Sequence, residues 1–228
     1  MTPASASLAS VLLKRWGLRA LSPTGIAPLD PARCRFAGRA ATIRYLPLRE
    51  DLAPRFHPVD PAAPSHDAIE AVQAGEVLVI EAEARAEAGI LGELMALRLQ
   101  MQGAAAVVCD AGMRDVAALR AMDLPVWCRG PAPASSSATL MLVEHGRPVA
   151  LGGVTIMQGD WMVGDEDGVV VCPAALWEEA LREVEAREAL EEYVKTRLAR
   201  GEPLRGLYPP DAAVQAAFET WRAERQYR

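Results

Sequence analysis

Several residue types that carry familiar chemistry are scarce in this 228-residue chain. Lysine occurs only at positions 14 and 195, one near the N-terminus and one in a charged helical stretch, so a Schiff-base lysine has little support. The four cysteines form no CxxC pair, and the three histidines have no partner at zinc-ligand spacing. These absences argue against a zinc site and a disulfide framework, which fits a reducing cytoplasm.

Long apolar runs, an excess of basic residues and nucleotide-binding loops are also lacking. No stretch approaches the length that crosses a bilayer, and residues 1–10 lack the charged start and apolar core of a signal peptide. The formal net charge of -6 argues against nonspecific nucleic-acid binding. No GxGxxG or GxxxxGK[ST] segment is present. We therefore expect a cytoplasmic protein without nucleic-acid or membrane partners.

The chain does hold enough apolar residues, 51% of the total, to bury one substantial core. Short apolar runs predict strands at residues 36–46, 77–80, 104–109, 125–128, 139–143, 154–156 and 169–172. Helical spacing predicts helices at residues 8–16, 68–74, 93–102, 174–200 and 212–225. The alternation indicates an α/β fold with a mixed sheet. We expect a single domain over residues 1–228, with its core at about 36–175 and a helical C-terminal extension at about 174–228.

Residues 47–64 contain five prolines, which predict an irregular surface loop that serves as a lid or a subunit contact. Further along, residues 165–167 are all acidic and suggest metal ligands. An Asp-Gly pair before three valines is also typical of a hairpin turn, and we favour the turn.

The most informative segment spans residues 89–115. A helix begins at Glu93 after two glycines, and the buried strand at residues 104–109 leads to Arg114 and Asp115. In α/β proteins, ligands bind beyond the carboxyl ends of strands, and helix N-termini favour anions. An Arg-Asp pair alone is more often a surface ion pair. Here the helix start and the strand end are expected to face one pocket.

The spacing of these residues resembles that of a known family. Glu93 is followed, after 20 residues, by Arg114 and Asp115. This pattern is similar to the acid-x20-Arg-Asp signature of the class II 4-hydroxy-4-methyl-2-oxoglutarate aldolases, which share a fold with the regulator of ribonuclease activity A. Four later segments match the family's landmarks in order: Leu124-Pro125-Val126, Gly152-Gly153-Val154, Gly159-Asp160 and residues 164–173. The resemblance covers roughly residues 36–210. It implies a single-domain layered α/β/α sandwich of the swivelling β/β/α type, with C-terminal helices.

The resemblance also implies roles for individual residues. Asp115 would be the direct protein ligand of a divalent metal, Mg²⁺ or Mn²⁺. Arg114 would hold the carboxylate or keto oxygen of the substrate and stabilise the negative charge that develops there. Glu93 stands where the aldolases often carry aspartate, and would orient water for proton transfer. Four backbone N–H groups would bind the carboxylate end of a pyruvate-like unit: those of Gly92, Glu93, Leu94 and Met95.

The implied function is a divalent-metal-dependent lyase that cleaves or decarboxylates a small 2-keto acid through a pyruvate enolate, of the aldolase or oxaloacetate decarboxylase type. Two alternatives stay open. Residues 201–210 resemble those of a longer-tailed branch in which some members act on sugar-derived 2-keto acids, which suggests a dehydratase. A non-enzymatic regulator that binds a ribonuclease is the other.

Relatives form trimers or pairs of trimers, so the resemblance implies a homotrimer or hexamer. In the aldolase-like relatives, a glutamate of the long C-terminal helix reaches the active site of the neighbouring subunit. Glu188, Glu191 and Glu192 are the candidates here, and the sequence does not choose among them.

Overall fold

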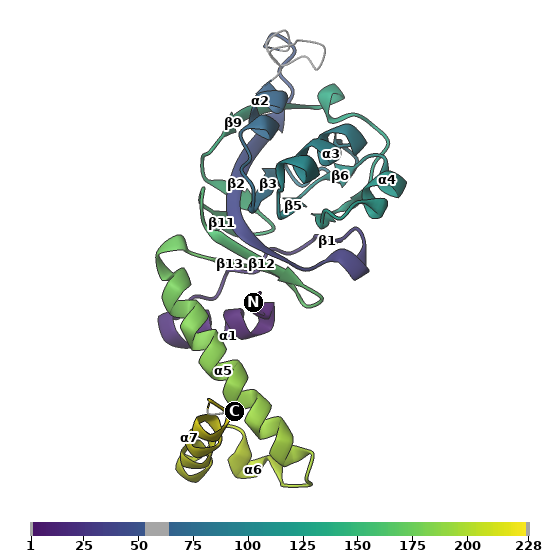
Figure 1. The fold of residues 1–228 in the computed structure, drawn as a ribbon. Helices are drawn as coiled ribbons and strands as arrows, with labels where there is room; N and C mark the ends of the chain where they lie inside the picture. The colour runs from purple at the N-terminus through teal and green to yellow at the C-terminus, as the bar shows by residue number, and fades with distance from the viewer. Residues whose placement is uncertain (1, 53–63, 227–228) are drawn as a thin grey trace. The chain divides into compact units, whose positions relative to one another are not determined.

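The computed structural model describes residues 2–52 and 64–226 (Figure 1). Most of the predicted proline-rich loop, residues 53–63, lies outside the described residues. The chain divides into two compact units, Met1–Trp177 and Glu178–Arg228. That they belong to one domain stays a prediction.

A mixed sheet forms the centre of the first unit. Its eight strands are β1 (Ala27–Pro28), β2 (Phe36–Pro47), β3 (Glu76–Glu81), β5 (Ala106–Cys109), β7 (Val126–Cys128), β9 (Leu140–His145), β12 (Trp161–Asp165) and β13 (Gly168–Cys172). The order is β1-β7-β5-β3-β2-β12-β13, and β9 also pairs with β2. Strands β2, β3, β5 and β7 run parallel, and the remaining pairs are antiparallel.

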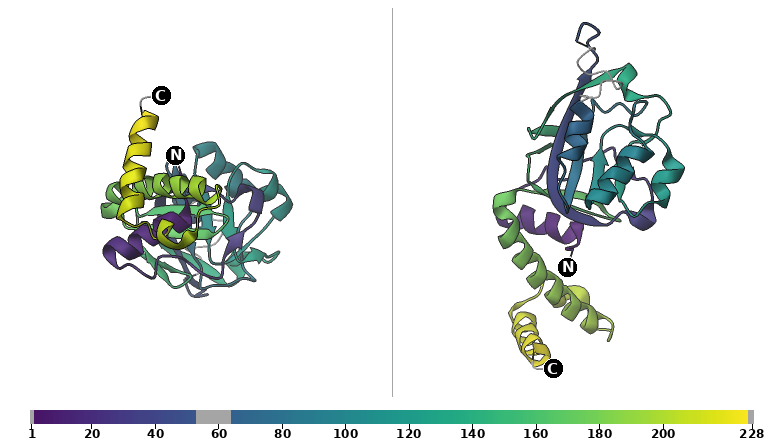
Figure 2. Two further views of the ribbon diagram at one scale, coloured as in Figure 1. Left: turned by 90° about the horizontal axis from the view of Figure 1, so that it is seen from below. Right: turned by 45° about the horizontal axis from the view of Figure 1, so that its top comes forward.

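Each face of this sheet is covered by a different layer. Side chains along β3 point alternately to the two faces of the sheet, and a separate hydrophobic cluster lies on each face. Leu78 and Ile80 belong to the first cluster, and Val77 and Val79 belong to the second. The first cluster includes side chains of three helices, which lie together on one side of the sheet (Figures 1 and 2): α2 (Pro64–Glu70), α3 (Glu93–Gln102) and α4 (Val116–Ala121). The second cluster includes an antiparallel pair, β10 (Val149–Leu151) and β11 (Val154–Ile156). The predicted layered α/β fold with a mixed sheet is confirmed.

Three very short strands extend the structure beyond the parallel part of the sheet. They are β4 (Gly89–Leu91), β6 (Gly112–Met113) and β8 (Gly130–Pro131). These strands follow β3, β5 and β7 in the chain and form a separate parallel sheet in the order β4-β6-β8. Each therefore carries the chain past the carboxyl end of a parallel strand, the region where α/β proteins bind ligands.

The second unit is helical. Its elements are α5 (Trp177–Leu198), which begins at the last residue of the first unit, α6 (Leu204–Leu207) and α7 (Ala212–Gln226). Tyr193 on α5 packs against Phe218 and Trp221 on α7, with ring centroids 5.8 and 5.4 Å away. The two predicted C-terminal helices are thus present. None of the helices in residues 2–52 and 64–226 is long and apolar enough to cross a membrane.

The remaining short helices are α1 (Ser5–Trp16) and three 3₁₀ segments, η1 (Pro31–Arg33), η3 (Ser136–Ala138) and η4 (Ala174–Leu176). Each predicted strand and helix has an observed counterpart: the helix at residues 93–102 and the strand at 154–156 have the predicted ends, and the ends of the others are shifted. The helix predicted at residues 68–74 is observed at Pro64–Glu70, and in the turn that follows it the Glu76 carboxylate accepts the N–H of Gln73 at 2.8 Å. Six observed strands were not predicted: the very short β1, β4, β6 and β8, the three-residue β10, and β12 (Trp161–Asp165), which pairs with both β2 and β13.

Helix α1 begins at Ser5 rather than at Leu8 because a distant carboxylate caps it. Its own N-cap residue, Ala4, has no capping side chain. Asp165 instead accepts hydrogen bonds from the backbone N–H of Ser5 at 2.7 Å and from the Ser5 hydroxyl at 2.6 Å. Asp165 ends β12, and the next two residues form the turn into β13, so the hairpin predicted for residues 165–167 is confirmed.

We predict that Asp165→Asn destabilises the protein by about 1–3 kcal/mol at neutral pH, because it removes charge-assisted hydrogen bonds to the start of α1. Burial raises the pKa of Asp165, but hydrogen bonds from Ser5 and Asp167 outweigh that effect and hold the pKa below its ordinary value. A lowered folded-state pKa contributes stability that is complete above the unfolded pKa of about 3.9 and is lost as the pH falls through the folded value.

Urea unfolding as a function of pH measures this contribution. The difference in free energy of unfolding between wild type and Asp165→Asn should be largest at pH 6 and should become smaller below about pH 4. Asp167→Asn, an exposed neighbour in the same turn, serves as the control. If that free-energy difference stays constant from pH 6 to pH 3, the carboxylate charge is not what stabilises the contact between Asp165 and Ser5.

Candidate active site

Three chain segments that leave β4, β6 and β8 surround a cavity of about 320 Å³. The segment after β4 leads into α3, the segment after β6 leads into α4, and the segment after β8 leads into η3. Strands β2 and β9 complete the wall. The cavity is lined by Tyr45, Ser65, Gly89, Ile90, Gly92, Glu93, Leu94, Met95, Arg114, Asp115, Ser135, Ser136, Ser137, Leu140, Met141 and Leu142.

Asp115 has an uncommon backbone conformation at the start of α4. Its φ of 52° lies in the left-handed region, which is costly for a residue other than glycine. Its carboxylate does not cap α4. Oδ2 instead accepts the backbone N–H of Glu93 at 3.1 Å, so the carboxylate lies against the N-terminus of α3. Oδ1 accepts no hydrogen bond from the described residues and is open to a ligand.

Two glycines make this arrangement possible. A Cβ on Gly92 would lie 2.5 Å from Oδ2 of Asp115, and a Cβ on Gly89 would lie 2.3 Å from Cγ of Arg114. The Gly89 position would also bring a Cβ to 2.6 Å from the carbonyl oxygen of Ala132. Both glycines have negative φ, so they are required for space rather than for backbone conformation. The side chains of Arg114 and Asp115 occupy the room that the glycines leave.

Arg114 is exposed and, within residues 2–52 and 64–226, forms no ion pair or hydrogen bond through its guanidinium group. Most arginines of the first unit do have such partners, for example Arg35 with Glu166 at 2.6 Å and Arg98 with Glu70 at 2.9 Å. An unpaired guanidinium at a cavity wall is suited to bind a carboxylate or an oxyanion in two-point contact.

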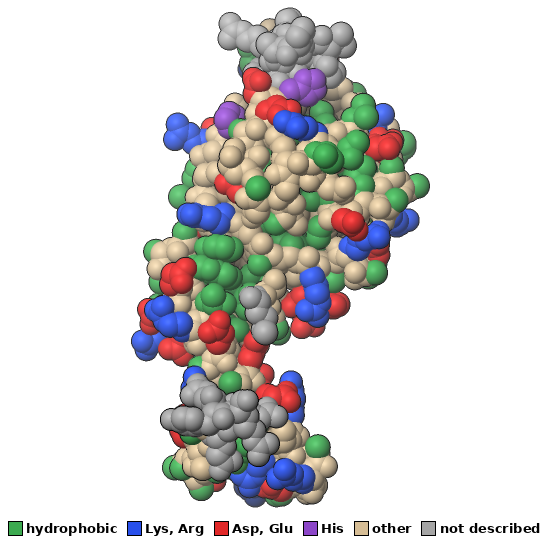
Figure 3. Space-filling view, viewed as in Figure 1, with side chains coloured by type: hydrophobic (Ala, Val, Ile, Leu, Met, Phe, Trp, Pro, Cys, Tyr) green, Lys and Arg blue, Asp and Glu red, His purple; other side chains and the backbone are tan. Residues whose placement is uncertain are grey.

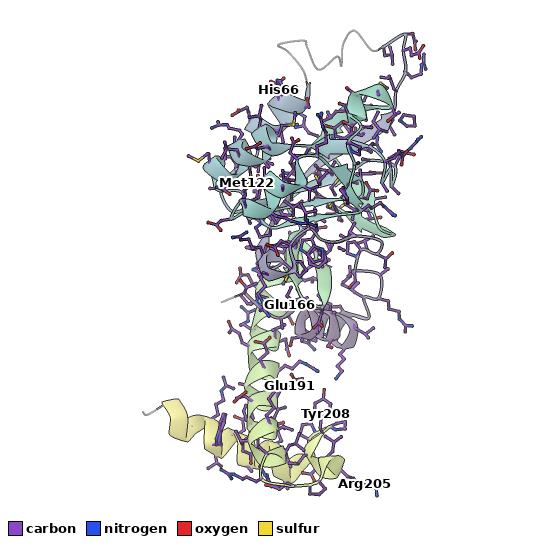
Figure 4. The ribbon with its side chains drawn as sticks, turned by 90° about the vertical axis from the view of Figure 1, so that its right-hand side faces the viewer. His66, Met122, Glu166, Glu191, Arg205 and Tyr208 are labelled. Atoms are coloured by element: carbon purple, nitrogen blue, oxygen red, sulfur yellow. The ribbon has the colours of Figure 1, made fainter. Side chains whose placement is uncertain are left out.

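The structure brings all six predicted site residues to this one cavity. Its lining includes Gly92, Glu93, Leu94, Met95, Arg114 and Asp115. Their roles in binding and catalysis stay predictions. His66 is an exposed residue of α2 and lines a neighbouring hollow rather than this cavity (Figure 4). Glu188, Glu191 and Glu192 belong to α5 in the second unit.

Sequence reasoning missed a second set of lining residues. Tyr45 comes from β2, and Ser135, Ser136 and Ser137 come from the segment after β8. Three consecutive serines after a proline-containing stretch were the available signal. Nothing local in the sequence connects them to Glu93 or Arg114, because they reach the cavity through pairing of distant strands.

The donor atoms at the cavity fit a hydrated hard cation better than a cation enclosed by protein. The described residues contain no group of three or more His, Cys, Asp or Glu side chains placed to hold a metal. Asp115 offers one carboxylate, and Glu93 adds a second acid at the same wall. Mg²⁺ commonly binds through one or two carboxylates and keeps several waters, so this sparse set is compatible with it.

Asp110, the first residue after β5, is a structural residue. Its carboxylate accepts the N–H groups of Ala82 and Ala84 at 2.6 and 3.1 Å, and it is only 4% exposed. Burial raises the pKa of Asp110 above its ordinary value. These bonds hold the turn in which Glu83 and Ala84 adopt positive φ, and that turn leads from β3 toward β4.

The three-layer fold and the cavity at its strand ends define a protein of the aldolase and ribonuclease-regulator class. The family model described as "RraA-like: Aldolase/RraA" matches residues 6–171, and the chain belongs to this family. A protein of Halalkalibacterium halodurans, provisionally named a 4-hydroxy-4-methyl-2-oxoglutarate aldolase, is 35% identical over 118 residues. That alignment covers 52% of this chain and 56% of the relative.

Protein DlpA of Legionella pneumophila is 31% identical over 78% of this chain, but the alignment covers 28% of DlpA. The chain therefore matches only part of the length of these two relatives. Among solved structures, an uncharacterized protein from Pseudomonas syringae has a TM-score of 0.79 at 26% identity, covering 92% of this chain and 90% of that one.

The structure of Streptomyces coelicolor RraAS2 has a TM-score of 0.74 at 31% identity. The match covers 84% of this chain and 91% of RraAS2. It is described as an unusual member of the RNase ES inhibitor RraA protein family. The relatives thus include proteins with an enzymatic name and proteins with a regulatory one.

We predict different outcomes for alanine at the two glycines. Gly89→Ala meets the Ala132 carbonyl as well as Arg114, so it should destabilise the protein by about 1–3 kcal/mol. Gly92→Ala meets only the movable end of a side chain closely, so it should cost less than about 1 kcal/mol while displacing the Asp115 carboxylate. Urea unfolding of both variants measures the costs. Equal stability of Gly89→Ala and wild type would contradict the close packing described here.

Proposed function

We propose that this protein is a divalent-metal-dependent lyase that acts on a small 2-keto acid by aldol cleavage or by the related decarboxylation of an oxaloacetate-like substrate. The observation that carries the proposal is the meeting of Arg114, Asp115 and the N-terminus of α3 in one cavity. Both reactions break a carbon–carbon bond and leave a pyruvate enolate, which needs positive charge near its oxygen.

The N-terminus of α3 supplies binding for the carboxylate of the substrate. Helix α3 begins at Glu93 with Gly92 as its N-cap, and its first N–H groups lie at the cavity wall. These groups lack partners within the helix and favour an anion. The N–H of Glu93 already bonds to Asp115, which leaves those of Leu94 and Met95 as the donors for a substrate carboxylate.

Arg114 stabilises the charge that develops when the carbon–carbon bond breaks. Its guanidinium reaches the same cavity without an ion-pair partner among the described residues, so it is available to the keto oxygen of the substrate. Preorganised donors at such an oxygen contribute about 10²–10³ in rate. Asp115 and the neighbouring waters would hold Mg²⁺ or Mn²⁺, which would supply Lewis acidity for the same oxygen.

Glu93 is the acid best situated to handle the proton. Its side chain is exposed at the first turn of α3 and lines the cavity beside Asp115. A carboxylate there can accept a proton from the substrate through one water molecule and return it to the enolate carbon.

A regulatory protein is the second candidate. The observation in its favour is the 31% identity to RraAS2 over 84% of this chain, because RraAS2 is described as a member of a ribonuclease-inhibitor family. A protein that only binds a ribonuclease would tolerate loss of Arg114 and Asp115. A dehydratase would instead require them but would conserve the carbon count of its substrate.

Pyruvate release tests the lyase proposal. We expect release from oxaloacetate or from 4-hydroxy-4-methyl-2-oxoglutarate in the presence of Mg²⁺ or Mn²⁺, and none with chelator. Asp115→Ala should abolish the response to metal, and Arg114→Lys should lower kcat by about 10²–10³, because lysine cannot form the two-point contact.

Two controls make this assay specific. Metal alone decarboxylates oxaloacetate, so that rate is subtracted. Asp123→Ala removes an exposed carboxylate outside the cavity and should leave activity unchanged. If no variant or metal changes pyruvate release from either compound, the lyase proposal is wrong, and ribonuclease binding becomes the function to test.

We also propose that the protein assembles as a homotrimer or hexamer. Three apolar side chains of α3 are exposed: Leu94 (80%), Leu97 (43%) and Met101 (72%). They recur on one side of the helix beside the cavity, and green side chains reach the surface over α3 in Figure 3. An exposed apolar stripe of this kind is typical of a protein–protein contact. In such an assembly, Glu188, Glu191 or Glu192 would approach the cavity of a neighbouring subunit.

The double variant Leu97→Glu/Met101→Glu should dissociate the assembly, because it places charge in an apolar contact. Light scattering measures the molar mass of wild type and variant. The control is Leu13→Glu, which changes an exposed leucine of α1, 47% exposed and outside α3. A wild-type protein that scatters as a monomer at all concentrations would rule out the proposed assembly.

A further inference from the structure

Two stretches of the first unit run side by side from the parallel sheet to the cavity, but they differ in length. The pairing of β3 with β5 ends at Ile80, and the pairing of β4 with β6 begins at Gly89. Between these two pairings lie residues 81–88 on one stretch but only residues 110–111 on the other. The longer stretch must therefore make a turn before the strands can pair again.

The carboxylate of Asp110 holds that turn. Its Oδ1 accepts the N–H of Ala82 at 2.6 Å, and its Oδ2 accepts the N–H of Ala84 at 3.1 Å. Glu83 and Ala84 have φ values of 56° and 55°, in the left-handed region that is costly for residues other than glycine. Asp110 is only 4% exposed, so water competes little for these bonds. The side chain of Asp110 thus stabilises a backbone that the local sequence does not favour.

Hydrogen bonds join the two stretches from this turn as far as the cavity. They run from the N–H of Gly112 to the Ala88 carbonyl at 3.0 Å, from the N–H of Arg114 to the Leu91 carbonyl at 2.9 Å, and from the N–H of Glu93 to Oδ2 of Asp115 at 3.1 Å. A Cβ on Gly112 would lie 2.6 Å from the carbonyl oxygen of Ala86, so the stretches are also closely packed. A shift of the turn would therefore also move the start of α3 relative to the residues that follow β6.

We propose that Asp110 is a positioning residue of the active site, which fixes the turn at residues 82–84 and thereby sets where the N-terminus of α3 lies against Arg114 and Asp115. The inference rests on the lyase function proposed above, in which these groups bind the 2-keto acid and stabilise its enolate. Asp110 lies outside the lining of the cavity, so it acts on the substrate only through them. A misplacement of about 1 Å can cost about 10²-fold in rate, so such a residue can control the reaction.

Amide hydrogen exchange, followed by NMR, measures the positioning without any reference to catalysis. Asp110→Asn keeps the size of the side chain but replaces one of its two acceptor oxygens with an N–H₂ donor. The amides of Glu93, Gly112 and Arg114 should then exchange at least about tenfold faster relative to the amide of Val107, which is buried in the sheet. Comparison with Val107 removes any effect of the variant on global stability.

Asp160→Asn is the matched control. Asp160 is also buried, at 8% exposed, and its carboxylate also accepts two backbone N–H groups, those of Met157 at 2.9 Å and Ala174 at 3.1 Å. It lies outside the cavity lining. The control variant should leave the exchange of the three amides, relative to Val107, unchanged.

Pyruvate release in the presence of Mg²⁺ or Mn²⁺ measures the consequence for catalysis, with whichever of the two compounds named above the wild type cleaves. Asp110→Asn should raise KM about tenfold and lower kcat about 10- to 100-fold, because substrate binding and enolate stabilisation both depend on the displaced groups. A smaller folded fraction would lower kcat alone, so the raised KM marks displaced binding groups. Asp160→Asn should leave both constants within about twofold.

A second background keeps the test possible if Asp110→Asn does not fold. Ala84→Gly relieves the strain of the turn, because glycine adopts a φ of 55° readily. Ala84→Gly/Asp110→Asn is then compared with Ala84→Gly alone, and the same changes in exchange, KM and kcat are expected. Thermal unfolding checks that every variant is folded.

The outcomes separate this inference from the lyase proposal. Unchanged relative exchange in Asp110→Asn, or faster exchange with wild-type kcat and KM, would overturn the positioning role and leave the lyase. Equal changes in Asp160→Asn would also overturn it, because the effect would then be that of any buried aspartate. A wild type that releases pyruvate from neither compound would defeat the lyase proposal and the positioning role together.

Discussion

The close approach of β4 and β6 to the segment that follows β8 is the constraint on which the site depends. Gly89, Gly112 and Gly130 stand side by side at the starts of the three short strands. A Cβ on Gly112 would lie 2.4 Å from the Ala132 Cβ, and one on Gly89 would meet Arg114 and the Ala132 carbonyl. A side chain at position 89 or 112 would push the segments apart, whereas a Cβ on Gly130 would meet nothing within 4 Å and that glycine is favoured by its φ of 132°. The glycines therefore allow three separate chain segments to converge on one cavity.

This convergence also explains the unfavourable backbone of Asp115. A left-handed conformation at a residue other than glycine costs of order 1–3 kcal/mol and persists only where surrounding contacts impose it. Arg114, the residue before Asp115, follows β6 and packs against Gly89. The Asp115 carboxylate accepts the N–H of Glu93. The Asp115 carboxylate therefore lies at the N-terminus of α3 instead of capping α4, the helix that it precedes. Such strain is concentrated at functional sites, which agrees with the proposed role of Asp115.

The sequence predicted the fold and half of the cavity well, for identifiable reasons. Buried runs such as Val77–Ile80 are strong local signals of parallel strands, and Glu93, Arg114 and Asp115 lie within two consecutive strand–helix units. Tyr45 and Ser136 escaped prediction because long-range pairing brings them to the cavity: β2 pairs with β9, with a register shift between Arg44 and Tyr45, and Gly89 pairs with Ser135. Strands of two or three residues, such as β6 and β8, have no periodicity to detect.

The two walls of the cavity have different structural origins. The charged wall is built by local units in which each strand delivers its residues directly to a helix start. The wall that holds Tyr45 and Ser136 depends instead on η3, on the long-range pairing of β2 with β9 and on the hydrogen bond from the N–H of Gly89 to the Ala134 carbonyl. In the lyase proposed above, the charged wall would break the bond, and side chains of the second wall, rather than Glu93, Arg114 and Asp115, would select among 2-keto acids.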